Sequence, residues 1–366
     1  MLNDSIGSAE ITVVVPVFRE AANIRPLVAA LEQALAGRLW EVVFVDDNSP
    51  DGTIDEVRAL AEADARVRGI RRIGRRGLSS AVIEGALSSS ARFIAVMDGD
   101  LQHDEERLGD LIDALAEDRC DIAVGSRHVA GGDNSGLSNA WRHMLSDTGI
   151  RMAQALMRVN LGDPMSGFFA VKRDYFNRIA PRLSGQGFKI LLDLILSTPH
   201  RPRVLEIPCR FKPRVAGESK LDILVLFQFL TLLLDKLCGG WLPVRFLTFA
   251  MVGAIGVLVN LAVMTLLHFA GQSFIISQSI GTLAAMLTNF MLDNAFTYRD
   301  RRLKGVRFYG GLLLFILVSS IGGWANVGVA QLFSAEGGGL DEASVAGALI
   351  GVVWNYAVSS TLIWRP

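Results

Sequence analysis

The sequence has few cysteines and no excess of charge of either sign. Its three cysteines, Cys120, Cys209 and Cys238, are widely spaced and odd in number. This argues against a disulfide framework and a zinc site, and it fits a reducing compartment. The formal net charge of −1 excludes a general nucleic-acid binder, which would need a strongly basic surface. Residues 1–10 are polar and carry no signal peptide, so we expect the N-terminal part to stay on the cytoplasmic side.

Long apolar runs are present, but they are unevenly spread. Hydrophobic residues make up 51% of the 366 residues. The first half of the chain has the composition of an ordinary soluble domain, whereas apolar runs dominate beyond Leu221. Because the length is enough for two domains, we expect a soluble domain followed by a membrane-bound part.

Strand and helix patterns alternate along the soluble part. Apolar, partly β-branched runs predict buried strands at residues 11–15, 41–45, 67–72, 93–97 and 121–124, and Pro16 should end the first of them. Helical spacing occurs at residues 23–36, after the first strand, and at residues 77–89, before the fourth. This alternation predicts βαβ units, a mostly parallel sheet and therefore an α/β domain.

Acidic residues end two of these strands, at the Asp-Asp of residues 46–47 and the Asp-Gly-Asp of residues 98–100. Ligands of α/β sheets bind at the carboxyl ends of the strands, and Gly99 lets the backbone turn so that both neighbouring carboxylates can face one ligand. Carboxylate oxygens suit Mg²⁺ or Mn²⁺ that bridges a diphosphate. The alternatives are a solvated turn after the fourth strand, and a helix cap from Asp51 or Thr53 after the second.

Several longer motifs carry a family resemblance. Val-Pro-x-Phe-x-Glu begins at Val15, Val-Asp-Asp-Asn-Ser-Pro-Asp-Gly-Thr at Val45, Gly-Leu-Ser-Ser-Ala-Val-Ile-Glu-Gly at Gly77, and Met-Asp-Gly-Asp-Leu-Gln-His at Met97. Gly-Ser-Arg follows at Gly125, and residues 163–169 and 217–221 continue the series. Together, over residues 13–221, the motifs resemble family 2 glycosyltransferases of the GT-A fold, and among these the dolichyl (polyprenyl) phosphate mannose synthases. The resemblance implies an α/β domain that binds a nucleotide sugar.

The resemblance also implies the residues that bind the donor. Those expected to hold the nucleoside are Pro16, Phe18, Glu20, Val45 and Asp47. Those expected at the sugar diphosphate are Asp98, Gly99, Arg214 and Lys220, and those expected on Mg²⁺ or Mn²⁺ are Asp100 and Gln102. Arg127 and Gly187 are further expected donor-binding residues. The sequence departs from the family pattern at Phe18-Arg19, in place of Tyr-Asn, and at Asp-Gly-Asp, in place of Asp-Ala-Asp.

The acceptor side is expected to be basic. Arg142 and Ser146 are four residues apart, so they share one face of a helix. The resemblance places them with Arg127 around the acceptor phosphate, which the guanidinium fork of arginine suits. The alternative is an exposed helix arginine with a small polar neighbour. The catalytic set implied by the resemblance is Asp98, Asp100, Arg127, Arg142 and Ser146.

A basic loop at residues 210–220 contains proline and glycine and could close over the site as a lid. The resemblance puts Arg214 and Lys220 on the donor diphosphate. A juxtamembrane cation can instead anchor to lipid headgroups, and we favour that role for Arg210 and Lys212.

The chemistry follows from a phosphate acceptor. A phosphomonoester has a second pKa of about 6, so it is mostly a dianionic nucleophile at neutral pH and needs no general base. The protein has to position two like-charged groups and neutralise the leaving nucleoside diphosphate. Single displacement with inversion at the anomeric carbon is the simplest expectation.

The rest of the chain predicts a membrane part. The apolar run at residues 223–234 is too short to span a bilayer, so we expect interfacial helices over residues 221–245. Four longer runs, at about 246–270, 274–296, 308–333 and 343–364, can each span. The basic linker 299–307 and the acidic linker 336–342 put both termini and the catalytic domain in the cytoplasm. Asn289-Phe290 and Trp354-Asn355-Tyr356 resemble the four-helix membrane domains called GtrA-like, over residues 246–366.

The leading hypothesis is a membrane-bound enzyme with a cytoplasmic GT-A domain over residues 1–220, which moves mannose from GDP-mannose to a dolichyl or polyprenyl phosphate. The nearest alternative keeps the acceptor and changes the donor, for example to UDP-glucose. A processive polysaccharide synthase is disfavoured because its Gln-x-x-Arg-Trp motif is missing. A lipid-linked sugar flippase with a binding-only soluble domain is the alternative from another class.

Overall fold

The computed structural model describes residues 9–127, 129, 154, 157, 159–185, 187, 189–211, 231–238, 241–335 and 351–365, without the side chains of residues 323–335. The chain divides into two compact units, Met1–Lys236 and Leu237–Pro366. The predicted boundaries after residues 220 and 245 stay a prediction.

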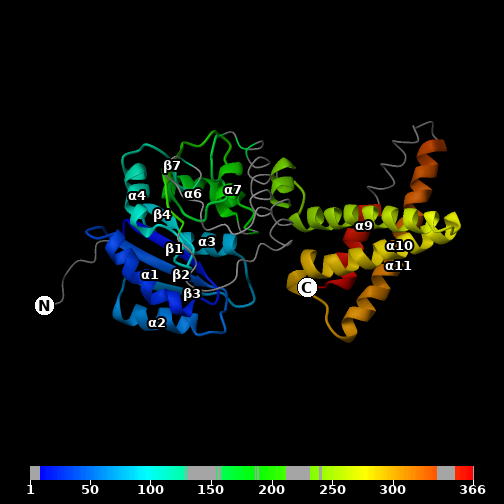
Figure 1. The fold of residues 1–366 in the computed structure, drawn as a ribbon, viewed down its shortest axis with the longest axis horizontal. Helices are drawn as coiled ribbons and strands as arrows, with labels where there is room; N and C mark the ends of the chain where they lie inside the picture. The colour runs from blue at the N-terminus through cyan, green and yellow to red at the C-terminus, as the bar shows by residue number, and fades with distance from the viewer. Residues whose placement is uncertain are drawn as a thin grey trace. The chain divides into compact units, whose positions relative to one another are not determined.

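The first unit is built on a seven-stranded sheet with the order β3-β2-β1-β4-β6-β5-β7. Figure 1 shows this unit with its helices around the sheet. The strands are β1 Ile11–Val17, β2 Trp40–Asp46, β3 Val67–Arg71, β4 Phe93–Val96, β5 Ile122–Ser126, β6 Phe169–Lys172 and β7 Val204–Pro208. Only β6 runs antiparallel to its neighbours, β4 and β5, and the other pairs are parallel. The predicted α/β class with a mostly parallel sheet is confirmed.

Helices cover both faces of this sheet, and alternate residues of the strands pack against each. The helices are α1 Ala21–Ala34, α2 Thr53–Ala63, α3 Leu78–Leu87, α4 Leu108–Ala116, α6 Arg173–Ile179 and α7 Ile190–Leu196. Val13 and Phe44 lie in the core with α1, α2 and α4, whereas Val14 and Val43 lie in the core with α3, α6 and α7. Successive strand residues point to opposite faces, which explains why these strands read as continuous apolar runs.

Three strands differ from the sequence prediction. Pro16 lies inside β1 rather than ending it, opposite Val45 of β2. The pairing of β1 with β4 stops at Val14, so a proline is tolerated where β1 has a neighbour on one side only. Strands β6 and β7 have no counterpart in the prediction. Strand β6 is four residues long and pairs with strands far away in the sequence.

Residues 231–236 form part of the first unit. Leu232 and Leu233 are buried in the core cluster that contains α7. Lys236 donates to Ser197 Oγ at 2.8 Å and lies 2.7 Å from the fully buried Asp193. This part of the predicted interfacial segment therefore belongs to the core of the α/β unit. The predicted placement of the segment in the plane of a membrane stays a prediction.

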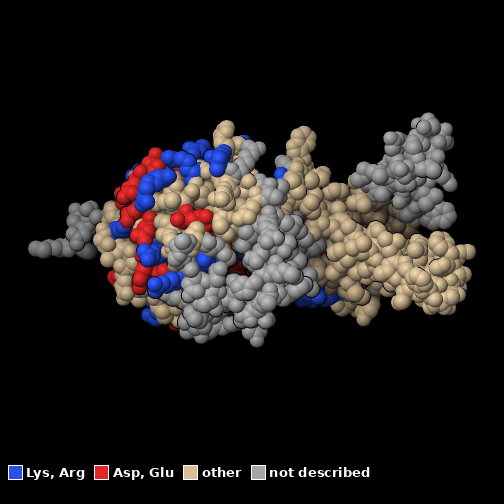
Figure 2. All heavy atoms as spheres, turned by 45° about the horizontal axis from the view of Figure 1, so that its top comes forward, with Lys and Arg blue, Asp and Glu red and all other residues tan. Residues whose placement is uncertain are grey.

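The second unit is helical. Its helices are α9 Val244–Phe269, α10 Phe274–Leu292 and α11 Val306–Ala335, with short turns at Asp293–Thr297, Arg299–Arg301 and Ser359–Ile363. Two helices, Val244–Phe269 and Phe274–Thr297, are long and apolar enough to cross a membrane, with mean hydropathies of 2.3 and 1.4. Charged side chains are dense on the first unit and sparse on these helices in Figure 2. The predicted third span corresponds to α11, and the predicted fourth begins outside the described residues.

An aromatic cluster joins Trp364 to the segment that follows α10. The Trp364 ring stacks on Tyr298 with centroids 4.3 Å apart, and its Nε1 donates to Asn294 Oδ1 at 3.1 Å. The backbone N–H of Leu303 donates to the same oxygen at 2.8 Å. The end of the chain is thereby fixed to the turn that follows α10.

The asparagines of the membrane unit pack on glycines of neighbouring helices. An added Cβ on Gly281 would lie 2.5 Å from Asn260 Oδ1, and one on Gly322 would lie 2.5 Å from Asn355 Oδ1. These two oxygens have no hydrogen-bond partner among the described residues. At these positions a side-chain oxygen of one helix thus packs closely against the bare glycine backbone of its neighbour.

Candidate active site

Five of the predicted donor residues lie at one edge of the sheet. Phe18 and Glu20 follow β1, Asp47 follows β2, Asp98 follows β4 and Arg127 follows β5. These four strands run in the same direction, since β4 and β5 are both antiparallel to β6. Their carboxyl ends therefore meet at the edge where α/β proteins bind ligands.

The two neighbouring aspartates after β2 have different surroundings. Asp46 is fully buried, and its carboxylate accepts the backbone N–H and the hydroxyl of Ser49. Ser49 Oγ in turn accepts the N–H of Arg19 at 2.9 Å, and Thr53 Oγ1 accepts the N–H of Glu20 at 3.1 Å. Asp46 is thus a structural residue that ties the loop after β2 to the loop after β1. Arg19 adopts a φ of +66°, which these contacts hold in place.

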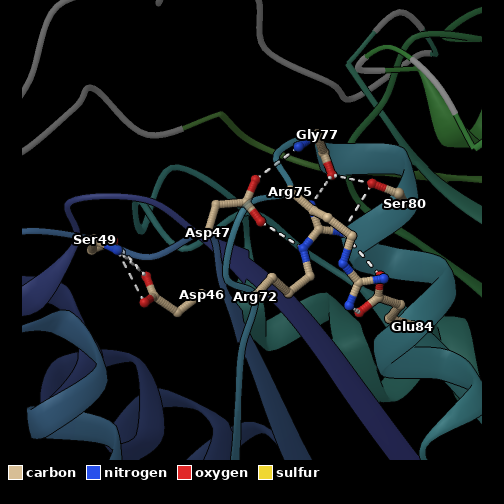
Figure 3. Close-up of polar contacts among 8 residues, drawn as sticks. All are labelled: Asp46, Asp47, Ser49, Arg72, Arg75, Gly77, Ser80 and Glu84. Atoms are coloured by element: carbon tan, nitrogen blue, oxygen red, sulfur yellow. Dashed lines mark hydrogen bonds and ion pairs between the residues drawn. The ribbon is translucent and has the colours of Figure 1, made fainter. Parts of the chain in front are cut away.

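Asp47 is held by a fully buried arginine (Figure 3). Arg72 Nε donates to Asp47 Oδ1 at 2.7 Å, and the N–H of Gly77 donates to Asp47 Oδ2 at 2.8 Å. The side chain of Arg72 has 0% exposure, and that of Asp47 has 13%. Arg72 also donates to Ser80 Oγ at 2.9 Å and to the Gly77 carbonyl at 3.1 Å. Arg72 therefore links Asp47 to the N-terminus of α3.

Two exposed arginines lie close to the ring of Phe18. The guanidinium carbon of Arg76 is 4.5 Å from the centre of the Phe18 ring, and that of Arg19 is 5.3 Å away. Both distances allow cation–π attraction. The position that departs from the family pattern thus carries an aromatic ring flanked by positive charge. Nearby, Glu20 accepts a hydrogen bond from the Asn23 amide at 2.6 Å.

The loop after β4 is tightly packed. A Cβ on Gly99 would lie 2.9 Å from Val17 Cγ1, so glycine is needed there for close approach to β1. The left-handed turn of the loop falls instead on Leu101, with a φ of +60°. Asp98 Oδ2 lies 3.1 Å from Nε2 of the buried His103. Asp100 Oδ1 accepts the N–H of Gln102 at 3.2 Å.

The oxygen atoms of this loop suit a hard divalent cation that is also bound by substrate phosphates. Asp100 and Gln102 offer oxygen ligands from one short turn, and Asp100 is half-buried. The part of the chain that the structure describes contains no group of three or more His, Cys, Asp or Glu side chains that could hold a metal alone. Mg²⁺ commonly binds one or two carboxylates plus substrate phosphates and water, which is the coordination that this loop could complete.

Arg127 is fixed by a buried carboxylate. Its Nε and Nη2 donate to Asp163 at 2.8 and 3.2 Å, and Asp163 is almost fully buried. The guanidinium carbon also lies 5.0 Å from the centre of the Phe211 ring. Because arginine has five N–H donors, this geometry leaves others for a phosphate.

Gly187 and Lys189 bring a further segment to the site. Gly187 has a φ of +78°, and its carbonyl accepts the N–H of Ser79 at 3.2 Å. Burial lowers the pKa of Lys189, while the nearby charge of Asp98 acts in the opposite direction. The ammonium group of Lys189 also interacts electrostatically with Arg127 and Asp163. Lys189 is therefore a buried amine beside Asp98, Arg127 and Asp163 that the sequence analysis missed.

The remaining predicted residues divide into two groups. Pro16 and Val45 pair with each other in adjacent strands beneath the site. The residues Arg142, Ser146, Arg214 and Lys220 lie outside the described part of the chain. The site residues that sequence reasoning missed are Arg72, His103, Asp163 and Lys189. His103 and Asp163 belong to quoted motifs, which was a signal that they lie near the site.

The fold and the strand-end carboxylates define a nucleotide-sugar glycosyltransferase domain joined to a membrane domain. Residues 12–180 match the model of glycosyl transferase family 2, and residues 248–364 match the model of the GtrA/DPMS transmembrane domain. These matches cover both units and confirm the predicted GT-A class and the GtrA-like membrane domain.

Curated relatives define the family more closely. A dolichol-phosphate mannosyltransferase of Pyrococcus furiosus is 30% identical over 97% of this chain and 99% of its own length. One of Saccharomyces cerevisiae is 39% identical over 61% of this chain and 85% of its own. An undecaprenyl-phosphate mannosyltransferase of Micrococcus luteus is 29% identical over 57% of this chain and 86% of its own. The chain belongs to the dolichol-phosphate mannosyltransferase family, and the prediction that it is an enzyme of this family is confirmed.

Proposed function

We propose that the protein transfers mannose from GDP-mannose to a dolichyl or polyprenyl phosphate and so makes polyprenyl-phosphate mannose. The observation that supports this most is the meeting of Asp98 and Arg127 at one sheet edge in a chain of this family. Asp98 lies on the predicted donor side and Arg127 on the predicted acceptor side. Between them lie His103 and Phe211, whose ring centres are 5.7 Å apart. A donor and an acceptor phosphate can therefore meet within one site.

The contacts of Asp47 favour guanine as the donor base. With Arg72 and the Gly77 N–H beside it, the Asp47 carboxylate accepts hydrogen bonds and cannot donate them. A carboxylate oxygen has two lone pairs, so each can accept one bond more. Guanine presents two adjacent donors, N1–H and the 2-amino group, whereas uracil presents a single N–H between two carbonyls. GDP-mannose thus matches this edge better than UDP-glucose, the alternative donor.

Asp100 and Gln102 would hold Mg²⁺ or Mn²⁺ on the donor diphosphate. The ion would supply positive charge that stabilises the leaving nucleoside diphosphate. Arg127, which Asp163 holds in place, adds positive charge on the other side of the sugar. Arg214 and Lys220 are proposed to close on the diphosphate, and Arg142 and Ser146 to bind the acceptor phosphate with Arg127.

The acceptor phosphate is the nucleophile of this reaction. One of its oxygens attacks the anomeric carbon, and the bond from that carbon to the donor phosphate breaks. Because the phosphate is already largely ionised at neutral pH, the side chains position charge and do not remove a proton. We propose a single displacement with inversion.

The orientation follows from the charges that flank the membrane helices. Arg299, Arg302 and Lys304 are exposed in the linker before α11. Under the positive-inside rule this linker, the catalytic domain and both termini lie in the cytoplasm. We propose a catalytic domain over residues 1–220, an interfacial segment over 221–245 and a membrane domain over 246–366.

Two measurements test the proposal. NMR of the lipid product should show an anomeric configuration opposite to that of the donor, and a retained configuration would overturn the single displacement. GDP should bind about tenfold or more tightly than IDP, which lacks the 2-amino group, because a hydrogen bond to a charged group is lost. Equal affinities would overturn the base assignment and reopen UDP-glucose as the donor.

A further inference from the structure

A buried histidine contacts the reaction centre without being one of the family's motif-assigned ligands. His103 Nε2 lies 3.1 Å from Asp98 Oδ2, and the imidazole is almost fully buried. An ionised carboxylate only accepts hydrogen bonds, so Nε2 carries the proton and donates it. Hydrogen bonds to a charged acceptor are stronger than those between neutral groups. The direction of the Asp98 carboxylate therefore depends on His103.

Two aromatic side chains fix the His103 ring. The ring stacks on Phe168 with centroids 5.3 Å apart and planes 21° apart. It meets Phe211 at an angle of 72° with centroids 5.7 Å apart. Held from two directions, the imidazole cannot turn to follow a moving carboxylate, so it fixes the position of Asp98.

The backbone that carries Phe168 also closes the space behind Asp98. A Cβ on Gly167 would lie 2.7 Å from Asp98 Oδ2, closer than such atoms approach. Ser166 Oγ anchors this backbone to β5 through a 2.7 Å hydrogen bond to the Gly125 carbonyl. Asp98 is thus confined between His103 and a rigid segment of main chain.

Phe211 connects His103 to Arg127, the residue proposed to bind the acceptor phosphate. Phe211 contacts His103 with its ring and lies beneath the guanidinium group of Arg127 at 5.0 Å. Asp163 holds the other side of that guanidinium group. Asp98, His103, Phe211 and Arg127 therefore form one continuous series of contacts.

We propose that His103 is a positioning residue that holds the Asp98 carboxylate toward the donor sugar and, through Phe211, sets the distance between Asp98 and Arg127. The inference rests on the proposed function, because it assigns the donor to Asp98 and the acceptor phosphate to Arg127. It predicts that the histidine N–H and the histidine ring contribute separately to the alignment of the two substrates.

Two variants of the full-length protein in detergent separate these contributions. H103F keeps an aromatic ring and loses the N–H, so kcat should fall about 10- to 100-fold while the affinity for a fluorescent GDP analogue changes less than about twofold. H103Q places an amide N–H near the position of Nε2 and should recover most of that loss. Wild-type kcat in H103F, or H103Q as slow as H103F, would overturn the proposal.

If H103F does not fold, the variants H103Q and H103N are compared instead. Asparagine is shorter than glutamine and its amide falls short of Asp98, so H103Q should exceed H103N about tenfold in kcat. Equal rates would overturn the proposal. F211L should raise the KM for polyprenyl phosphate about two- to fivefold through loss of the cation–π contact. An unchanged acceptor KM would refute the connection to Arg127.

Wild-type protein is tested first with GDP-mannose and with UDP-glucose. Transfer from UDP-glucose alone would overturn the donor assignment, and the variants would then be compared with that donor. Failure of the proposed function and failure of the His103 proposal therefore give different results.

Discussion

Replacing Arg72 with methionine should destabilise the α/β unit substantially. The change leaves Asp47 without its partner on Oδ1 and removes a donor from Ser80 and from the Gly77 carbonyl. Breaking a buried ion pair costs about 3–5 kcal/mol. Asp47 keeps its hydrogen bond from the Gly77 N–H and is 13% exposed, so we expect the lower end, about 3 kcal/mol. At about 2–4 °C per kcal/mol, the melting temperature should fall by about 6–12 °C.

The buried cysteines of this unit provide the assay. Burial raises the pKa of the Cys120 thiol and raises that of Cys209 to about 12. Both should therefore stay unreactive toward a thiol-specific fluorescent dye until the unit unfolds. Cys238 is half-buried and lies outside this core, so the measurement is made in a Cys238→Ser background.

A neighbouring arginine provides the matched control. Arg71, the last residue of β3 and the neighbour of Arg72, is exposed and donates to Asn48 at 2.8 Å, so R71M should shift the melting temperature by less than about 2 °C. If an unpaired Asp47 causes the loss in R72M, the D47N/R72M double variant should recover part of it. A melting temperature for R72M within 2 °C of that of R71M, with no coupling to D47N, would refute the reasoning.

Three further changes test other parts of the structure. Gly167→Ala puts a methyl group 2.7 Å from Asp98 Oδ2, so kcat should fall about 100-fold, and an unchanged kcat would contradict this packing. Lys236→Met leaves the fully buried Asp193 without its cation at 2.7 Å, so the dye assay should show a loss of about 3 kcal/mol. A wild-type melting temperature would show that this ion pair does not hold the segment. Asp100→Ala should abolish the GDP-dependent part of Mn²⁺ binding in an EPR titration, and unchanged binding would contradict the metal assignment.

The sheet could be predicted where strands are buried on both faces. The runs at β1, β2 and β4 are largely apolar because helices cover both sides of them, so each strand was found to within one or two residues. Strand β6 was missed because four residues give little periodicity and its partners are distant in the sequence. The prediction that Pro16 ends β1 was wrong because a strand tolerates a proline where it has a neighbour on one side only.

The sequence predicted the residues expected to bind substrate and metal, but it did not predict the residues that hold them in position. The strand-end aspartates stand out because acids rarely follow an apolar run without reason. Arg72 gave no such signal, since its pairing with Asp47 depends on β3 lying beside β2. Nor could the sequence separate Asp46 from Asp47, because a difference of one residue on a strand decides which side chain is buried. The contact of His103 with Phe211 could not be predicted either, because these residues are far apart in the sequence.

The central claim is best tested by offering purified protein radiolabelled GDP-mannose and UDP-glucose in parallel, with Mg²⁺ or Mn²⁺ and a short polyprenyl phosphate in detergent. The label that enters the organic phase is counted. We expect label from GDP-mannose, dependent on the lipid phosphate and lost in Asp98→Asn. Label from UDP-glucose alone would contradict the donor, and no lipid-dependent label from either donor would contradict the proposed transfer.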